Sequence, residues 1–173
     1  MYRKESDDPR HDLVGEGERL SWLRRHGVPA AEVLECRPGL LVTAEVPGGS
    51  AAGAWPADCV PDLDEPRRGW TRAELIAELL ATRPGDEDTV VCHGDLSLSN
   101  VLLDPATCRV SGLIDAGRVG VADRWVDLAI VTRSLAGHPD PHVGSMVDRC
   151  LDRYGVAQDP VKDGFYRLLD EFA

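Results

Sequence analysis

The sequence has too few basic residues to form an extended surface for nucleic acid. It holds 19 Lys and Arg against 30 Asp and Glu, a formal net charge of −11. Because phosphate backbones select basic patches, this imbalance argues against nucleic acid as a partner. An acidic surface keeps a protein in solution, and an acidic cleft would also attract and orient a polycationic substrate.

Long apolar runs and paired cysteines are also missing. The opening MYRKESDDPR lacks the apolar region of a signal peptide, and no later run is long enough to cross a membrane. The five cysteines are odd in number and form no C-x-x-C pair, which is typical of reduced cytosolic thiols. The sequence therefore predicts a cytoplasmic protein without a membrane partner. Its 173 residues are the length of a single domain that can bury a core.

The polar residues that could carry chemistry gather in the segment 89–118. Three short apolar runs in it predict strands: Thr89–Cys92, Val101–Leu103 and Val110–Ile114. Asp95 and Asn100 lie in the polar loop between the first two runs, and Asp115 follows the third. Carboxylate and amide oxygens of this kind suit a hard divalent cation, above all Mg²⁺.

Helices are predicted on both sides of this segment. Apolar spacing and capping or stop residues indicate five of them: Glu16–Arg25, Thr71–Leu80, Asp123–Leu135, His142–Tyr154, and a last one that begins at Asp159-Pro160. Thr71 and Glu74 have the spacing of a capping box. Two further strands are expected within 31–35 and 40–46.

The central segment resembles the catalytic core of the protein-kinase-like phosphotransferases. In the kinase signature an acid follows a His by two positions and an Asn follows that acid by five. His93, Asp95 and Asn100 keep this spacing, while Gly94 replaces the usual Arg. The run HGDLSLSN followed by GLIDAGRVGVADRWVDLA looks most like the aminoglycoside 3'-phosphotransferases, bacterial enzymes that phosphorylate a sugar hydroxyl of antibiotics such as kanamycin and neomycin.

The resemblance implies an α+β, two-lobed protein-kinase-like fold over the whole chain, 1–173. Residues 1–48 would form a partial small lobe and the hinge, and 49–173 a mainly helical lobe with the short catalytic hairpin. Compared with the family, the first two strands and the loop that covers the phosphates would be missing ahead of Lys4, and several tens of residues would be missing around Ser50–Trp70. The incomplete small lobe would then expose a strand edge that could pair with a second chain.

The resemblance also implies ATP and Mg²⁺ as cofactors. Lys4 would contact the phosphates and pair with Glu16, with Glu18 as the less favoured alternative. By itself Lys4 reads as an exposed terminal lysine. Asn100 and Asp115 would hold the metal. The hinge within Thr43–Gly48 would hold adenine, and its implied binding residues are Thr43, Ala44 and Val46.

Catalytic and substrate residues follow from the same resemblance, each beside a plainer alternative. Asp95 would orient or accept the proton of the attacking hydroxyl, where otherwise it caps a turn, and Arg118 would orient Asp95 or meet the phosphates rather than form a surface ion pair. Arg133 matches a position near the drug, although a solvated helix arginine is the safer interpretation. Asp170 and Glu171 would bind the drug's ammonium groups, unless they are two acids on a frayed terminal helix.

The leading hypothesis is therefore ATP-dependent phosphorylation of the 3'-hydroxyl of aminoglycosides, which would confer antibiotic resistance. Two alternatives stay open. The chain could be an impaired or inactive kinase-like remnant, because the cover over the triphosphate is missing. It could also phosphorylate another small hydroxylated molecule, because substrate choice depends partly on the missing middle region.

Overall fold

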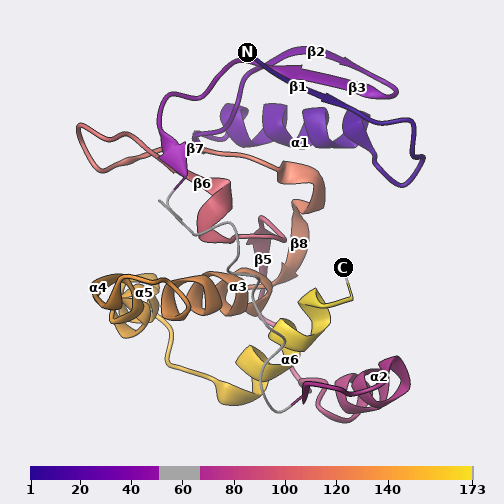
Figure 1. Ribbon diagram of the computed structural model, residues 1–173, viewed down its shortest axis with the longest axis vertical. Helices are drawn as coiled ribbons and strands as arrows, with labels where there is room; N and C mark the ends of the chain where they lie inside the picture. Colours follow the sequence, from indigo (N-terminus) through magenta and orange to yellow (C-terminus); the bar gives the residue numbers. More distant parts are fainter. Residues whose placement is uncertain (51–66, 173) are drawn as a thin grey trace. The chain divides into compact units, whose positions relative to one another are not determined.

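A computed structural model describes residues 1–50 and 67–172 (Figure 1). Contacts within the chain divide it into two compact units. The first unit comprises Met1–Gly53 and Val91–Val121, and the second comprises Ala54–Val90 and Ala122–Ala173. The predicted catalytic hairpin thus belongs to the same unit as the N-terminal segment, whereas the lobe boundary at residue 48 remains a prediction.

A three-stranded antiparallel sheet in the order β1-β3-β2 begins the first unit. Its strands are β1 (Tyr2–Glu5), β2 (Val33–Arg37) and β3 (Leu40–Thr43). All four residues of the central strand β3 are buried, as a continuous apolar run in the middle of a sheet should be. Lys4 lies opposite Leu41 in the register. The two strands predicted within 31–35 and 40–46 are confirmed as β2 and β3.

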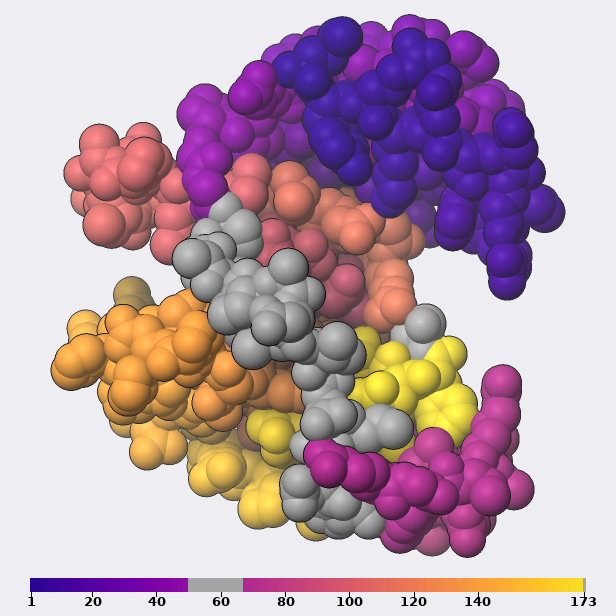
Figure 2. All heavy atoms as spheres, viewed as in Figure 1, coloured from indigo at the N-terminus to yellow at the C-terminus, as the bar shows by residue number. Residues whose placement is uncertain are grey.

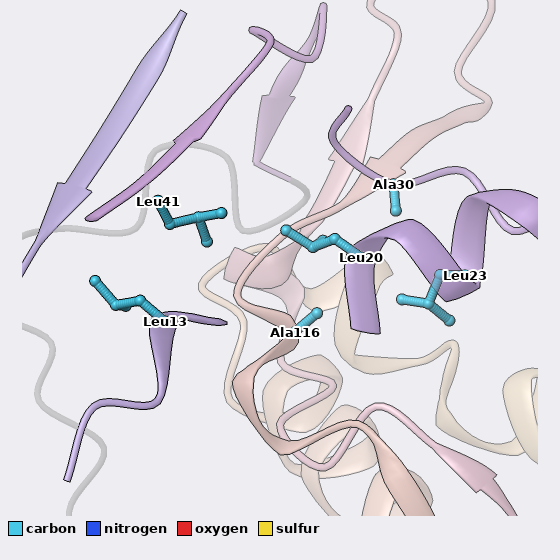
Figure 3. Close-up of a cluster of buried hydrophobic side chains, with 6 residues drawn as sticks. All are labelled: Leu13, Leu20, Leu23, Ala30, Leu41 and Ala116. Atoms are coloured by element: carbon cyan, nitrogen blue, oxygen red, sulfur yellow. The ribbon is translucent and has the colours of Figure 1, made fainter. Parts of the chain in front are cut away.

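Helix α1 (Leu13–Arg25) packs against this sheet (Figure 1). It starts three residues before the predicted Glu16, because the Asp12 side chain accepts a hydrogen bond from the Gly15 amide and caps the helix there. Its buried leucines recur on one face and meet side chains of β3 and of the segment after the hairpin (Figure 3). The members of this cluster are Leu13, Leu20, Leu23, Ala30, Leu41 and Ala116.

The catalytic hairpin completes the first unit. A second sheet has the order β4-β6-β7, with β4 (Gly49–Ser50), β6 (Val101–Leu103) and β7 (Val110–Leu113). Two single turns flank the hairpin, η2 (Leu98–Asn100) and η3 (Ala116–Arg118). Its exposed tip, 105–109, stands out from the surface (Figure 2). The predicted strands of the hairpin are therefore confirmed.

Strands β5 (Thr89–Cys92) and β8 (Gly120–Asp123) form a separate two-stranded sheet. β5 runs into the loop with Asp95, and β8 follows the turn with Asp115 and Arg118. The sheet therefore pairs the strand that enters the predicted site with the strand that leaves it.

The second unit is built from helices around one apolar cluster. They are α2 (Arg72–Ala81), α3 (Trp125–Ala136), α4 (Pro141–Gly144), α5 (Val147–Tyr154) and α6 (Pro160–Asp170). The cluster contains Trp125, Leu128, Ala129, Leu151, Phe165 and Tyr166. The predicted capping box of α2 is confirmed, since Thr71 and Glu74 exchange both hydrogen bonds. Among the described residues, no helix is both long and apolar enough to span a membrane.

The prediction of one helix over His142–Tyr154 is wrong. The chain forms α4 and α5 instead, with a break at Ser145 and Met146. The Ser145 hydroxyl donates to the His142 carbonyl at 2.8 Å, and a serine that bonds the nearby backbone competes with a continuous helix. Gly144, a weak helix former, precedes the break. The expected stop at Gly155 is confirmed by its φ of 89°.

Candidate active site

A cavity of about 380 Å³ lies in the first unit and gathers seven of the predicted site residues. These seven are Lys4, Glu16, Thr43, Ala44, Val46, Asn100 and Asp115. They come from β1, α1, the end of β3 and the catalytic hairpin, so distant parts of the sequence meet here. The volume is within the usual range for small-molecule sites, about 300–1,000 Å³.

The remaining lining residues are Tyr2, Ala31, Glu45, Leu102 and Ile114. None of them was named as a site residue, although Glu45 falls within the predicted hinge. Ala31, Leu102 and Ile114 supply apolar surface, and each lies in or beside a predicted strand. The alternation of side chains along a strand was the available signal, but it cannot tell a core face from a cavity wall.

Lys4 connects two acids in the cavity. Its Nζ atom lies 3.0 Å from Glu16 Oε2 and 3.0 Å from Asp115 Oδ1. Burial by itself lowers the pKa of Lys4, but the hydrogen bonds to Glu16 and Asp115 outweigh it, so the pKa is raised above its ordinary value. The Lys4 ammonium group is therefore charged at neutral pH.

Asp115 has an unusual backbone conformation. Its φ of 58° and ψ of 53° place it in the left-handed region, which few residues other than glycine adopt. The next residue, Ala116, is completely buried in the cluster under α1 and anchors the turn. The bend directs the chain from β7 into η3 and leaves the Asp115 carboxylate half-exposed beside Lys4. Strained conformations of this kind concentrate at functional sites.

Hydrogen bonds fasten the loop of Asp95 to the strand that leads to Asp115. His93 Nε2 donates to the Ile114 carbonyl at 3.0 Å, and the Ile114 amide donates to the Asn100 carbonyl at 3.1 Å. Asn100 Nδ2 donates to the Asp95 carbonyl at 2.8 Å. This donation defines which end of the Asn100 amide is nitrogen, so its Oδ1 oxygen is the atom suited to a cation.

The backbone conformation and surroundings of Gly94 explain why glycine, and not the arginine of the kinase signature, stands at this position. Its φ is 84°, and a Cβ atom there would lie 2.5 Å from the Arg118 carbonyl oxygen. A side chain would therefore clash with main chain rather than with a movable side-chain end. The close approach brings the loop of Asp95 against the turn that follows Asp115.

We expect Gly94→Ala to destabilise the chain by at least about 2 kcal/mol, because a left-handed conformation and a backbone clash add together. Gly120→Ala is the matched control, since its Cβ would have no neighbour nearer than 3.8 Å. Urea unfolding of both variants measures the difference. Equal midpoints for the two variants would contradict the close approach.

Asp95 is half-buried and its carboxylate makes no hydrogen bond to the parts of the chain described, 1–50 and 67–172. Neither Asp95 nor the exposed Arg118 is among the residues that line the cavity. Both belong to the same unit as the cavity, and Asp95 is tied to it through Asn100. The arrangement leaves the Asp95 carboxylate available to a ligand.

The three predicted substrate residues contact one another in the second unit. Arg133 Nη1 donates to Glu171 Oε1 at 3.0 Å, and Arg133 Nη2 donates to Asp170 Oδ2. The two carboxylates thus bind the same guanidinium group. All cavity-lining residues belong to the first unit, so these three are not part of that lining.

The model of the phosphotransferase enzyme family matches residues 51–166. The chain belongs to this family. Its relatives include an aminoglycoside 3'-phosphotransferase of Streptomyces fradiae, 42% identical and aligned over 93% of this chain and 80% of the relative. A second, from Streptomyces ribosidificus, is 39% identical over 92% of this chain and 80% of the relative.

Solved structures show the fold of this phosphotransferase. An aminoglycoside 3'-phosphotransferase of type VIII matches with a TM-score of 0.80 at 38% identity, over 93% of this chain and 80% of that one. An aminoglycoside phosphotransferase from Streptomyces rimosus, in complex with ADP and streptomycin, matches with a TM-score of 0.79 at 27% identity, over 98% and 85%. The predicted α+β, kinase-like fold is therefore confirmed.

The phosphotransferase is shorter internally than its relative from Streptomyces fradiae. The alignment extends over 213 residues, whereas the chain has 173. The relative therefore has residues within the aligned region that this chain lacks. An internal shortening was expected from the sequence, and its predicted place around Ser50–Trp70 falls largely outside the described residues.

Proposed function

We propose that this phosphotransferase moves the terminal phosphoryl group of ATP to the 3'-hydroxyl of aminoglycoside antibiotics and so confers resistance on its host. The supporting observation is the cavity in which seven predicted residues meet. The names of the Streptomyces relatives support the substrate class. The ADP and streptomycin bound to the Streptomyces rimosus protein support a nucleotide and a cationic sugar as ligands.

The cavity fits a nucleotide in two respects. Ala31, Leu102 and Ile114 offer apolar walls for adenine, next to the main chain of Ala44 and Val46. The Lys4 ammonium group, which also lines the cavity, supplies a positive charge for the phosphates. Glu16, which is buried, would keep Lys4 in position whether or not a nucleotide is bound.

Asn100 and Asp115 fit Mg²⁺, which prefers carboxylate and amide oxygens together with phosphates and water. Both line the cavity, and Asn100 presents Oδ1 because its Nδ2 donates to Asp95. A Mg²⁺ ion held by these two residues would supply positive charge to compensate the phosphates. Lys4 now pairs with Asp115, so this lysine would exchange part of that contact for the phosphates.

Asp95 would act on the substrate hydroxyl. Its carboxylate orients the hydroxyl and accepts its proton, while the loop bonds of His93 and Asn100 hold the residue in place. Arg118 would meet the phosphates or orient Asp95. Catalysis of phosphoryl transfer consists mainly of such positioning and charge compensation.

Asp170 and Glu171 would bind ammonium groups of the drug through charge-assisted hydrogen bonds. In this structure Arg133 donates hydrogen bonds to both acids. A cationic substrate would therefore have to displace Arg133 or bind the same carboxylates together with it. The net charge of −11 favours the approach of such a substrate. A cytoplasmic location, and self-association through the incomplete small lobe, remain predictions from the sequence.

The decisive experiment follows ATP turnover by the purified chain with Mg²⁺ and a kanamycin-type drug, beside the same drug type without its 3'-hydroxyl. We expect turnover and a phosphorylated product only when the 3'-hydroxyl is present. Equal turnover with both drugs would place the phosphoryl group elsewhere on the sugar. No turnover from a chain shown to be folded by circular dichroism would favour an inactive remnant.

A further inference from the structure

Lys162 is a buried cation to which no role has been assigned above. It lies in the first turn of α6, where Asp159 accepts hydrogen bonds from the Val161 and Lys162 amides. Only 7% of Lys162 is exposed. Lysine is almost never buried to this degree unless it is paired, so its partners indicate what it does.

Its main partner is Asp123, the last residue of β8, whose side chain has no exposed surface. Lys162 Nζ lies 2.9 Å from Asp123 Oδ2. A second acid, Asp86, lies 3.5 Å from Nζ but its side chain is almost fully exposed. The contact with Asp123 is therefore the stronger of the two, because water screens it less.

The same oxygen also accepts a hydrogen bond from the main chain just before β5. Asp123 Oδ2 accepts the Asp88 amide at 2.9 Å, while Oδ1 accepts the Trp125 amide at 2.8 Å. The Arg124 amide in turn donates to the Asp88 carbonyl at 3.1 Å. One carboxylate thus ties together the start of β5, the end of β8 and the first turn of α6.

The two strands that meet at Asp123 are directly connected to the segments with the proposed catalytic residues. Along the chain, β5 runs directly into the loop of Asp95, and β8 follows the turn of Asp115. They pair with each other as a two-stranded sheet. A shift of β5 along β8 would therefore move the Asp95 loop relative to the Asp115 turn.

We propose that Lys162 is a positioning residue for phosphoryl transfer: it fixes Asp123 Oδ2 where that atom accepts the Asp88 amide, and so holds β5 beside β8. The inference rests on the proposed function. Misplacement of reacting groups by about 1 Å can slow a reaction about 100-fold. Lys162 touches no substrate in this role and acts only through Asp123.

The titration of the pair agrees with this arrangement. The hydrogen bond to Asp123 raises the pKa of Lys162. Burial by itself raises the pKa of Asp123, but hydrogen bonds from the Trp125 amide, Lys162 and the Asp88 amide outweigh it and lower the pKa. Both groups are therefore charged at neutral pH, and the contact is an ion pair.

Hydrogen exchange of the intact chain, followed by mass spectrometry, tests the anchoring without any need for activity. In Lys162→Met we expect exchange of the β5 amides, from Asp88 onward, to be faster by roughly tenfold or more, since a charge-assisted contact to their acceptor is lost. The core of α3 should stay protected. Unchanged exchange in β5 would overturn the proposal.

Arg167→Met is the matched control. Arg167 lies on the same helix, α6, and its Nε atom pairs with Asp163 at 3.0 Å rather than with Asp123. Like Lys162→Met, Arg167→Met removes one cation from α6 together with an ion pair, but not the contact with Asp123, and it should leave β5 exchange unchanged. Equal acceleration in both variants would mean general loss of stability and would overturn the positioning role.

Kinetics complete the test. Lys162→Met should lower kcat about tenfold or more with little change in KM for ATP, and Lys162→Arg should recover most of kcat because it restores a cation.

If Lys162→Met does not fold, the double variant Lys162→Met/Asp123→Asn takes its place in the exchange experiment, because it leaves no unpaired buried charge. Fast β5 exchange in this folded double variant supports the proposal, and exchange as in the parent chain contradicts it.

Failure of the proposed function gives a different result. A parent chain that turns over no ATP with any aminoglycoside would refute that function. The exchange comparison would still show whether Lys162 holds β5 beside β8.

Discussion

Replacing Asp95 by Asn should lower the turnover number for aminoglycoside phosphorylation by roughly 100- to 10,000-fold, the usual contribution of a positioned general base. Asn has nearly the same shape, so the loop bonds of His93 and Asn100, both made to main-chain carbonyls, should persist. The amide cannot accept the hydroxyl proton as a carboxylate can. Nucleotide binding should change little, because Asp95 does not line the cavity.

The measurement is kcat and KM for the drug and for ATP in the parent chain and in Asp95→Asn. Asp104→Asn is the control for loss of a nearby acid. Asp104 caps the hairpin turn by accepting the Ala106 and Thr107 amides, a role that asparagine also performs. A turnover number for Asp95→Asn within a factor of three of the control would exclude Asp95 as the base.

Asp115→Asn should reduce turnover by about 1,000-fold or more, because loss of an anionic metal ligand removes several kcal/mol of charge compensation for the phosphates. Asparagine tolerates the left-handed backbone that Asp115 adopts. The variant should therefore keep its fold, although Lys4 loses one of its two carboxylate partners. The affinity for Mg²⁺ with nucleotide should fall in parallel.

Asp115→Ala separates chemistry from backbone strain. It removes the same ligand but forces alanine into the left-handed region, so its unfolding free energy should be lower than that of Asp115→Asn by about 1 kcal/mol. Thermal unfolding and a Mg²⁺ titration of nucleotide binding measure the two effects. Normal Mg²⁺ dependence in Asp115→Asn would refute the assignment of Asp115 to the metal.

Local features of the fold were predictable wherever neighbours in the sequence provide the interaction. The capping box of Thr71 and Glu74 and the cap of α6 by Asp159 depend on residues within one turn. The strands of the catalytic hairpin follow from their own apolar pattern and the turn residues between them. The start of α1 was placed late, because the cap by Asp12 precedes the apolar pattern that identified the helix.

The residues of the site were predictable through the spacing of His93, Asp95 and Asn100 and through the resemblance it supports. Composition and periodicity could not have selected Lys4 from other exposed lysines. Ala31, Leu102 and Ile114 were missed because apolar residues beside strands look alike whether they face the core or a cavity. The assignment to the phosphotransferase family does not depend on these missed residues, because it rests on the family match.

The sequence by itself determined most of the helices, the strands of the hairpin, the acidic charge and the order of the catalytic groups, because these depend on residues close together in the chain. The break between α4 and α5 was not among them. Only the tertiary structure decided that Lys4 would meet both Glu16 and Asp115. It also decided that Gly94 would lie against the Arg118 main chain and that Lys162 would pair with Asp123. Each of these contacts joins distant segments, and its geometry exists only after the sheets and helices have packed.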